Sequence, residues 1–294
     1  MKLFIADAFT QNVFGGNPAG VVILDDGAPF PPEETMLKTA AELRYSETAF
    51  IRQLSENEFN IRYFTPAAEV DLCGHATIAA FHCLLEAGLT RDGGEYLNKT
   101  LAGDLKISIE NGFIMMEMAS PDYLGSMEDA DKISRLYDIM GIPYEAVRAG
   151  DKLLVPEIIS TGLPDIIMPV SSRTQLAAMS PDFKALSELS REYNVTGVHA
   201  FTLDCADEKI TAHCRNFAPL YDIDEEAATG TANGALTYYL YRNRLISDGR
   251  FSFIQGEAMN RPSEVHAAID NADNSVNIQI GGSAAILVKG EIAL

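Results

Sequence analysis

Short segments from the first half of the chain return, in the same order, in its second half. Four pairs match: 16–22 with 161–168, 49–50 with 200–201, 62–66 with 215–219, and 74–79 with 230–235. The interval between partners grows slowly along the chain, as a duplication followed by small insertions would leave it. A repeat of this length constrains the fold strongly, because both copies must be able to build the same architecture.

We therefore expect two similar domains, an N-terminal one over residues 1–120 and a C-terminal one over residues 121–294. The chain breaks naturally at Ser120-Pro121-Asp122, and the last strands, within 265–294, are free to pair with either sheet. Apolar strand-like runs such as 2–9, 21–24 and 48–51 alternate with helical patterns. This alternation indicates an α/β (α+β) fold.

Three helices are predicted in the first half of the chain and just beyond it. Acidic residues after Pro31-Pro32 favour a helix that runs towards Arg44. Apolar residues at helical spacing predict a second helix over 75–87, ended by Gly88, and a third over 133–140.

Composition excludes several partners. The 294 residues carry a formal net charge of −20, so nucleic acid or an anionic membrane surface is not an expected partner. No apolar run approaches the roughly 18 residues of a membrane span. Asp7 interrupts the N-terminal apolar run before a signal-peptide core could form. The pattern predicts a soluble, cytoplasmic protein.

Neither a metal nor an organic cofactor is indicated by residue spacing. The cysteines form no Cys-x-x-Cys pair, and the histidines show no His-x-x-x-His or His-Glu-x-x-His spacing. Ligands that converge from distant segments are not excluded by this. Because Gly-x-Gly-x-x-Gly and Walker loops are also absent, the protein's own side chains are expected to carry the chemistry.

The two glycine-led helices are candidate binding sites for a small carboxylic acid. Gly74 and Gly230 each follow a strand and an irregular loop, and glycine permits unusual φ and a close approach of ligand to backbone. The first amides of a helix are unpaired and lie at the positive end of its dipole. Two such openings that face one cleft between the copies would hold a substrate carboxylate. The alternative is that both glycines serve only tight packing.

Glu47 is the candidate acid/base residue. It begins the apolar segment Ala49-Phe50-Ile51, where partial burial would raise the pKa of a carboxyl group towards neutrality. The matching position of the second copy is Val198, so the shared scaffold does not require an acid there. The alternative is a surface glutamate at the start of a strand.

Four further residues are candidates on weaker grounds. His75 and Thr231 follow the two helix-opening glycines and could donate hydrogen bonds to an anion. Asn17, between Gly16 and Pro18, could point an amide at a ligand, or could simply form a turn. Glu226 lies in an acidic run that in most proteins is a solvated loop.

These residues also carry a family resemblance. The segments 14–21, 46–50, 73–77, 160–162 and 228–232 resemble the phenazine-biosynthesis PhzF-like family. The resemblance implies the diaminopimelate-epimerase-like fold, in which two similar domains each wrap a sheet around a central helix. It further implies a homodimer, an active site between the domains, and no metal or organic cofactor.

The resemblance also assigns roles. It makes Glu47 the acid/base group of a proton-moving isomerisation and His75 its supporting histidine, while Thr231 replaces a family serine. Glu226 stands where the family usually has aspartate, and Ala227 where it has proline. Because of these two departures, two questions stay open: whether the Glu226 carboxylate extends to the same place as the family aspartate, and whether this protein uses the phenazine substrate itself.

We expect a cofactor-independent isomerase that moves a proton between carbons of a small, cyclic carboxylic acid. Gly74, Gly230, Thr231 and Asn17 would bind the substrate, with Glu47, His75 and Glu226 as catalytic residues. One alternative is a one-base epimerase or dehydratase that uses Cys73, since Cys73-Gly74-His75 also resembles a proline racemase segment. The other is a non-catalytic relative that binds a small acid.

Overall fold

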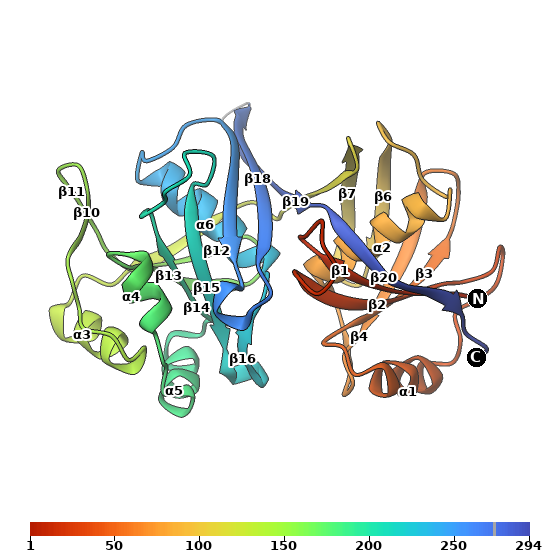
Figure 1. The fold of residues 1–294 in the computed structure, drawn as a ribbon, viewed down its shortest axis with the longest axis horizontal. Helices are drawn as coiled ribbons and strands as arrows, with labels where there is room; N and C mark the ends of the chain where they lie inside the picture. The colour runs from red at the N-terminus through yellow and green to blue at the C-terminus, as the bar shows by residue number, and fades with distance from the viewer. Residues whose placement is uncertain (273–274) are drawn as a thin grey trace. The chain divides into compact units, whose positions relative to one another are not determined.

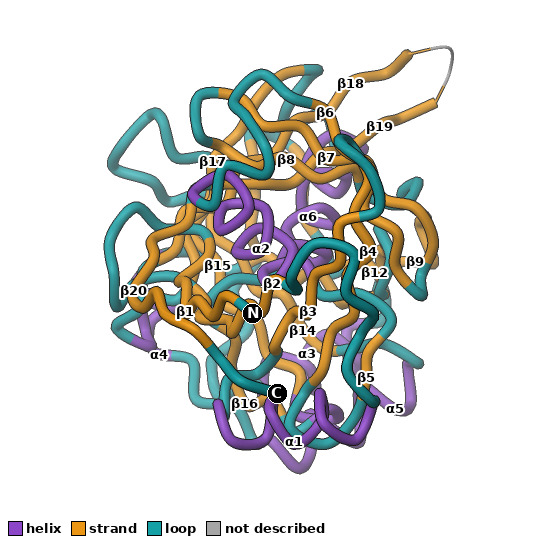
Figure 2. Tube along the Cα trace, turned by 90° about the vertical axis from the view of Figure 1, so that its right-hand side faces the viewer, coloured by secondary structure: helices purple, strands orange, loops and turns teal. Residues whose placement is uncertain are grey.

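The chain divides into two compact units. The computed structural model describes residues 1–272 and 275–294. Unit 1 comprises Met1–Glu117 together with Gly281–Leu294, and unit 2 comprises Met118–Ile280. Each unit contains more strand than helix (Figure 1, Figure 2).

Unit 1 contains nine strands and two helices among its described residues. The strands are β1 (Lys2–Ala8), β2 (Asn17–Ile23), β3 (Thr48–Gln53), β4 (Glu58–Phe64), β5 (Glu69–Val70), β6 (Glu95–Thr100), β7 (Gly103–Glu110), β8 (Phe113–Glu117) and β20 (Ala284–Glu291). The helices are α1 (Glu33–Leu43) and α2 (Gly74–Glu86), which confirms the first two predicted helices to within a few residues.

Unit 2 is larger and contains four α-helices among its described residues. Its strands are β9 (Asp122–Ser126), β10 (Val147–Ala149), β11 (Lys152–Leu154), β12 (Glu157–Ser160), β13 (Pro164–Pro169), β14 (Gly197–Thr202), β15 (Ala212–Ala218), β16 (Ile223–Glu226), β17 (Gly249–Gln255) and β18 (Ser263–Ala272). Its helices are α3 (Ala130–Ile139), α4 (Arg173–Ala178), α5 (Phe183–Tyr193) and α6 (Gly230–Arg242), with short 3-10 turns η1 (Pro219–Tyr221) and η2 (Glu257–Met259). Strand β19 (Ser275–Gly282) runs across the boundary.

The two units pair their strands in the same order. In unit 1 the order is β20-β1-β2-β3-β4-β6-β7, and in unit 2 it is β9-β12-β13-β14-β15-β17-β18. The parallel pairs fall at the same places, β2 with β3 and β4 with β6 in unit 1, β13 with β14 and β15 with β17 in unit 2. All four matching sequence segments therefore lie on equivalent elements.

The C-terminal strand completes unit 1. Residues 121–294 were assigned to the second domain, with the last strands free to pair with either sheet, and β20 pairs antiparallel with β1 and belongs to unit 1. In unit 2 the equivalent place beside β12 is taken by β9, an earlier strand of the same unit. Both termini of the given chain lie in unit 1 (Figure 1).

Each unit wraps its sheet around one central helix. Helix α2 packs against β1, β2, β3, β8 and β20, and α6 packs against β12, β13, β14 and β18. Nearly every residue from His75 to Leu84 is buried, as expected for a helix that is apolar on all sides. The α+β fold with a central helix in each unit, expected from the sequence, is confirmed.

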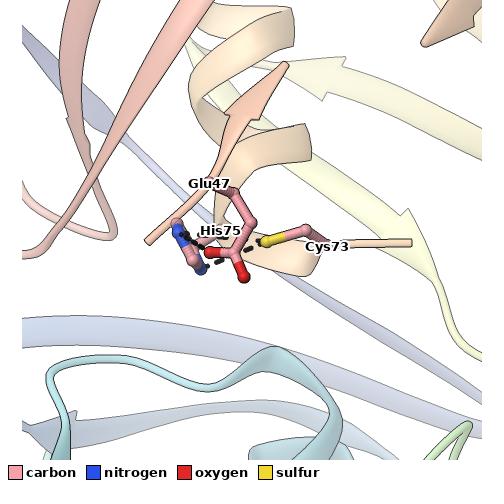
Figure 3. A group of neighbouring side chains, drawn as sticks. All are labelled: Glu47, Cys73 and His75. Carbon is pink, nitrogen blue, oxygen red and sulfur yellow. Dashed lines mark hydrogen bonds and ion pairs between the residues drawn. The ribbon is translucent and has the colours of Figure 1, made fainter. Parts of the chain in front are cut away.

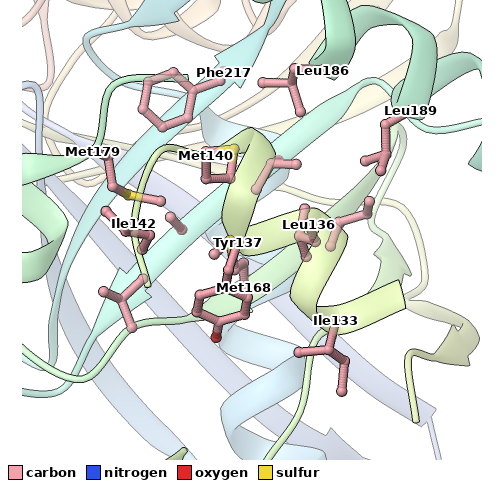
Figure 4. Packing of buried hydrophobic residues seen from close by; sticks show 14 of the residues in the cluster. Ile133, Leu136, Tyr137, Met140, Ile142, Met168, Met179, Leu186, Leu189 and Phe217 are labelled. Atoms are coloured by element: carbon pink, nitrogen blue, oxygen red, sulfur yellow. The ribbon is translucent and has the colours of Figure 1, made fainter. Parts of the chain in front are cut away.

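The outer face of each sheet carries a separate apolar core. In unit 1, Met36 and Ala40 of α1 pack with Phe50 and Phe64. In unit 2, α3 and α5 supply Leu136, Tyr137, Leu186 and Leu189 to a larger cluster that includes Phe217 (Figure 4). Among the residues described by the structure, no helix has both the length and the apolar character needed to cross a membrane.

A hydrogen-bond chain fixes the first turn of α2 on the sheet. Asn98 Nδ2 donates to Tyr63 Oη over 2.9 Å, and Tyr63 Oη lies 2.6 Å from Thr77 Oγ1. Thr77 Oγ1 in turn donates to the carbonyl of Cys73 over 2.7 Å, so Tyr63 is the donor to Thr77. Burial raises the pKa of Tyr63, which keeps its phenol protonated for this bond.

In unit 2 the carbonyl of Thr229 corresponds to that of Cys73, and it accepts a hydrogen bond from Asn233, four residues further along the chain. Asn233 Nδ2 donates to the Thr229 carbonyl over 2.9 Å and to Gln255 Oε1 over 2.8 Å. Both units therefore tie the start of the central helix to the sheet through buried polar side chains, which makes this region rigid.

Tyr63→Phe tests the hydrogen-bond chain. Removing the hydroxyl leaves Asn98 and Thr77 partly unpaired in the interior, so the free energy of unfolding should fall by about 1–3 kcal/mol in urea denaturation. The same change at Tyr221, which is 60% exposed, should shift it by less than about 0.5 kcal/mol. Equal effects at both positions would show that the buried chain contributes nothing.

Candidate active site

Glu47 lies directly before β3, at the start of an interior strand of unit 1's sheet. Its backbone carbonyl accepts a hydrogen bond from the amide of Gly20 on β2, at 3.1 Å, which anchors the residue to the sheet. Its side chain is only 14% exposed. The alternative of an ordinary surface glutamate is thus not what the structure shows.

His75 and Cys73 come from the start of α2. His75 is the second residue of the helix and its side chain is 4% exposed. Cys73 is the residue before the helix, and it makes no side-chain capping hydrogen bond. The hydrogen-bond chain that ends on the Cys73 carbonyl therefore holds both residues in place.

These side chains meet in one cluster (Figure 3). Glu47 Oε2 lies 3.1 Å from His75 Nε2 in an ion pair, and Ser46 Oγ lies 3.2 Å from the same nitrogen. Cys73 Sγ lies 3.4 Å from His75 Nδ1 and 3.9 Å from Nε2. The imidazole ring is thus in contact with a carboxylate, a hydroxyl and a thiol.

The ion pair reverses the expected shift of Glu47. Burial, the largest single effect, raises the pKa of the carboxyl group, while His75 lowers it through a hydrogen bond and its charge. With further hydrogen bonds from Ser46 and Cys73, the pKa falls below its ordinary value. The expectation of a raised pKa was wrong, because the sequence showed the burial of Glu47 but not its partner.

The other two groups of the cluster keep their protons. Burial opposes a charge on His75, yet the electrostatic and hydrogen-bonding effects of the neighbouring Cys73 sulfur and of the Glu47 carboxylate raise its pKa well above the ordinary value. Burial, followed by the charge of Glu47, raises the pKa of the Cys73 thiol to about 11. In neutral solution the cluster is a carboxylate, an imidazolium and a thiol.

Asn17 and Gly74, the two further candidates of unit 1, lie in a strand and at the start of a helix. Asn17 begins β2, pairs with Ala8 and is 5% exposed. Gly74 is the first residue of α2, and like Gly230 of α6 it is not among the described residues with positive φ. Unusual backbone freedom is therefore not the reason for glycine at these two positions.

The candidates of unit 2 gather at the start of α6. Thr229 Oγ1 donates to Glu226 Oε2 over 2.9 Å, so the carboxylate is tied to the residue before the helix. Gln255 Nε2 donates to the Glu226 carbonyl over 2.7 Å. The carbonyl of Thr231 accepts from Thr161 Oγ1 over 2.9 Å, which holds the first turn of α6.

Asp165 is a polar residue of this region that sequence reasoning missed. It lies on β13 and is 1% exposed. Burial and the charge of Glu226 raise its pKa to about 7, against a hydrogen bond from the Gly197 amide. An acid within the apolar run Pro164-Asp165-Ile166-Ile167, where the first copy has Ala19, was the available signal.

The chain has relatives of similar length. A model of the family described as phenazine biosynthesis-like protein, PhzC-PhzF, matches residues 6–290. A protein of Clostridium acetobutylicum described as an uncharacterized isomerase is 33% identical, over 100% of this chain and 98% of that protein. YddE of Escherichia coli K12, also described as an uncharacterized isomerase, is 30% identical over 100% and 98%.

Solved structures agree with these relatives. The crystal structure of a Bacillus anthracis phenazine biosynthesis protein of the PhzF family matches with a TM-score of 0.86 at 28% identity, over 100% of this chain and 99% of that one. A hydroxyproline epimerase from Agrobacterium vitis matches with a TM-score of 0.61 at 14% identity, over 100% and 92%, which is a likeness of fold alone.

The comparisons confirm the expected class, an enzyme of the isomerase type. They do not reach the substrate or the roles of individual residues. Because the family model matches nearly the whole chain, the chain belongs to the phenazine biosynthesis-like family, PhzC-PhzF.

Proposed function

We propose that this enzyme moves a proton between carbons of a small, cyclic carboxylic acid without a cofactor, and that Glu47 is its acid/base group. The observation that carries the proposal is the ion pair of 3.1 Å between the largely buried Glu47 carboxylate and His75. A carboxylate that is ionised in neutral solution is ready to accept a proton from an acidified C–H bond.

His75 gives the proton transfer its electrostatic support. When Glu47 accepts the substrate proton, the carboxyl group becomes neutral and the neighbouring imidazolium loses its counter-charge. The negative charge that develops on the substrate then replaces it, so a preorganised cation stabilises the intermediate. The low pKa of Glu47 also favours return of the proton, at a different carbon, which completes the isomerisation.

The first turn of α2 supplies a binding site for the substrate carboxylate. This turn lies at the positive end of the helix dipole, which favours a bound carboxylate. His75 lies in the same turn, and an acid bound there would be placed beside the acid/base pair. The roles of Asn17, Glu226, Gly230 and Thr231, and the homodimer, stay predictions.

Glu47→Gln tests the acid/base role. The amide keeps the size of the side chain but cannot accept the proton, so exchange of solvent deuterium into carbon positions should fall by about 10²–10⁴-fold. The measurement is NMR in D2O with a panel of cyclic and amino carboxylic acids.

Glu42→Gln, at an exposed position of α1, is the matched control and should retain exchange. A Glu47→Gln enzyme with full exchange activity would refute the proposal. Tight binding of an acid by the unaltered protein, with no exchange at any carbon, would instead favour the non-catalytic alternative.

Cys73→Ser separates the Glu47 mechanism from a cysteine mechanism. A thiol with a pKa of about 11 is mostly protonated in neutral solution and is a poor general base. The variant should therefore lose no more than about tenfold in exchange rate, much less than Glu47→Gln. Loss of exchange in Cys73→Ser, with activity retained in Glu47→Gln, would make Cys73 the base.

The ion pair should also leave a signature in stability against pH. The lowered pKa of Glu47 stabilises the fold fully above the ordinary glutamate pKa of 4.5, and this contribution declines as the pH falls below it. The raised pKa of His75 stabilises the fold fully below the ordinary histidine pKa of 6.5, and this contribution declines as the pH rises towards the raised pKa.

The pair therefore contributes most between the two ordinary pKa values, 4.5 and 6.5. Urea denaturation of the unaltered protein and of Glu47→Gln should give the largest difference in unfolding free energy in this window. The difference should shrink on both sides of it. A difference that does not vary with pH would mean that Glu47 and His75 are not charged partners.

A further inference from the structure

The segment before α6 is tied to the end of β17 by one buried side chain. Gln255, the last residue of β17, is fully buried. Its Nε2 donates to the Glu226 carbonyl over 2.7 Å and to Thr229 Oγ1 over 3.1 Å. Its Oε1 accepts from the Thr229 amide over 3.3 Å and from Asn233 Nδ2 over 2.8 Å. Both ends of the Gln255 amide therefore hold the segment 226–229 and the first turn of α6.

These bonds also fix the direction of the Thr229 hydroxyl. A backbone carbonyl only accepts and a backbone N–H only donates, so the Glu226 carbonyl and the Thr229 amide orient the Gln255 side chain. Its Nε2 is a donor only. Thr229 Oγ1 therefore accepts from Nε2 and gives its own proton to Glu226 Oε2, 2.9 Å away. The Glu226 carboxylate thus receives a hydrogen bond from a donor whose place is fixed.

The turn after β17 holds the backbone of the same segment. Ser263 Oγ donates to the Ala227 carbonyl over 2.7 Å, and this bond is buried. Gly256 has a φ of +80°, and a Cβ at this position would lie 2.7 Å from the same carbonyl oxygen. Ala227 stands where the family resemblance places proline, whose ring would stiffen the chain. Here hydrogen bonds to the neighbouring turn restrict the segment instead.

We propose that Thr229 and Gln255 are positioning residues for Glu226, the second predicted catalytic carboxylate. The inference rests on the proposed function and extends it to unit 2. A glutamate side chain has one more rotatable bond than aspartate, so its carboxylate has more orientations to lose. A charge-assisted bond from a fixed hydroxyl selects one of them, and the orientation of a catalytic group contributes to the rate. Thr229 contacts Glu226 directly, whereas Gln255 acts through Thr229.

Thr229→Val and Thr229→Ser form a matched pair of variants. Valine has the shape of threonine without the hydroxyl, and serine keeps the hydroxyl. Exchange of solvent deuterium, measured by NMR, should fall about 10–100-fold in kcat in Thr229→Val, with a change of less than about threefold in KM. Thr229→Ser should stay within about threefold of the unaltered protein. Full exchange activity in Thr229→Val would overturn the proposal.

Dependence on Glu226 separates positioning from a general loss of structure. Glu226→Met keeps the length of the side chain and removes the carboxylate. In that background Thr229→Val should slow exchange by less than about threefold, because the group that the hydroxyl positions is already gone. Gln255→Met should act as Thr229→Val does, and the two together should cost little more than either alone. Equal losses with and without Glu226 would overturn the proposal.

Urea denaturation measures the coupling between Thr229 and Glu226 without any substrate. Thr229→Val should lower the folding equilibrium constant about tenfold in the otherwise unaltered protein and less than about threefold beside Glu226→Met, because a hydrogen bond to a charged acceptor is lost only in the first case. Thr174→Val, at an exposed position of α4, is the control and should cost the same in both backgrounds. A cost of Thr229→Val that does not depend on Glu226 would contradict the hydrogen bond on which the proposal stands.

The two proposals fail in different ways. Full exchange activity in Glu47→Gln would refute the proposed function, while the coupling of Thr229 to Glu226 in unfolding would stay measurable and decide the positioning by itself. Exchange that requires Glu47 but not Glu226 would overturn the positioning and leave Glu47 as the acid/base group.

Discussion

The first turn of α2 is the constraint on which the candidate site depends. Asn98, Tyr63 and Thr77 pass hydrogen bonds from the sheet to the carbonyl of Cys73, so the turn cannot move without leaving buried polar groups unpaired. His75 and Cys73 are held by that turn, and the Glu47 carboxylate meets them from the edge of β3. A charged pair in a largely buried place persists only where its partners are fixed in this way, since ordering them anew would cost free energy at each encounter.

The duplicated scaffold carries different chemistry in its two copies. Both units keep the same strand order, and both keep an arginine that stacks on a phenylalanine and pairs with a glutamate, Arg62 with Glu69 and Arg215 with Glu225. These shared features are structural, because both arginines stack on rings of the outer apolar clusters, Arg62 on Phe64 of β4 and Arg215 on Phe217 of β15. The acid and imidazolium occur in unit 1, whereas unit 2 has Val198 and Thr231 at the matching positions and adds the buried acid Asp165. Duplication thus preserved the frame and left the polar residues at the helix openings to diverge.

The charge state of the cluster decides what it can do. A lone buried glutamate would hold its proton more tightly, and would suit donation better than abstraction. Beside an imidazolium, the same group is ionised and ready to accept a proton, and the cation remains to balance the charge that the substrate develops.

The sequence alone was sufficient for the duplicated architecture, for most helices to within a few residues, and for Glu47, Cys73 and His75 as individual candidates. These follow from local patterns, since matching segments, apolar periodicity and helix openings are written in neighbouring residues. Tertiary structure decided the rest. It assigned β20 to unit 1, because an unpaired edge beside β1 is filled from the far end of the chain. It lowered the pKa of Glu47 where burial alone predicted a rise, because electrostatic shifts depend on distances between residues that lie far apart in sequence.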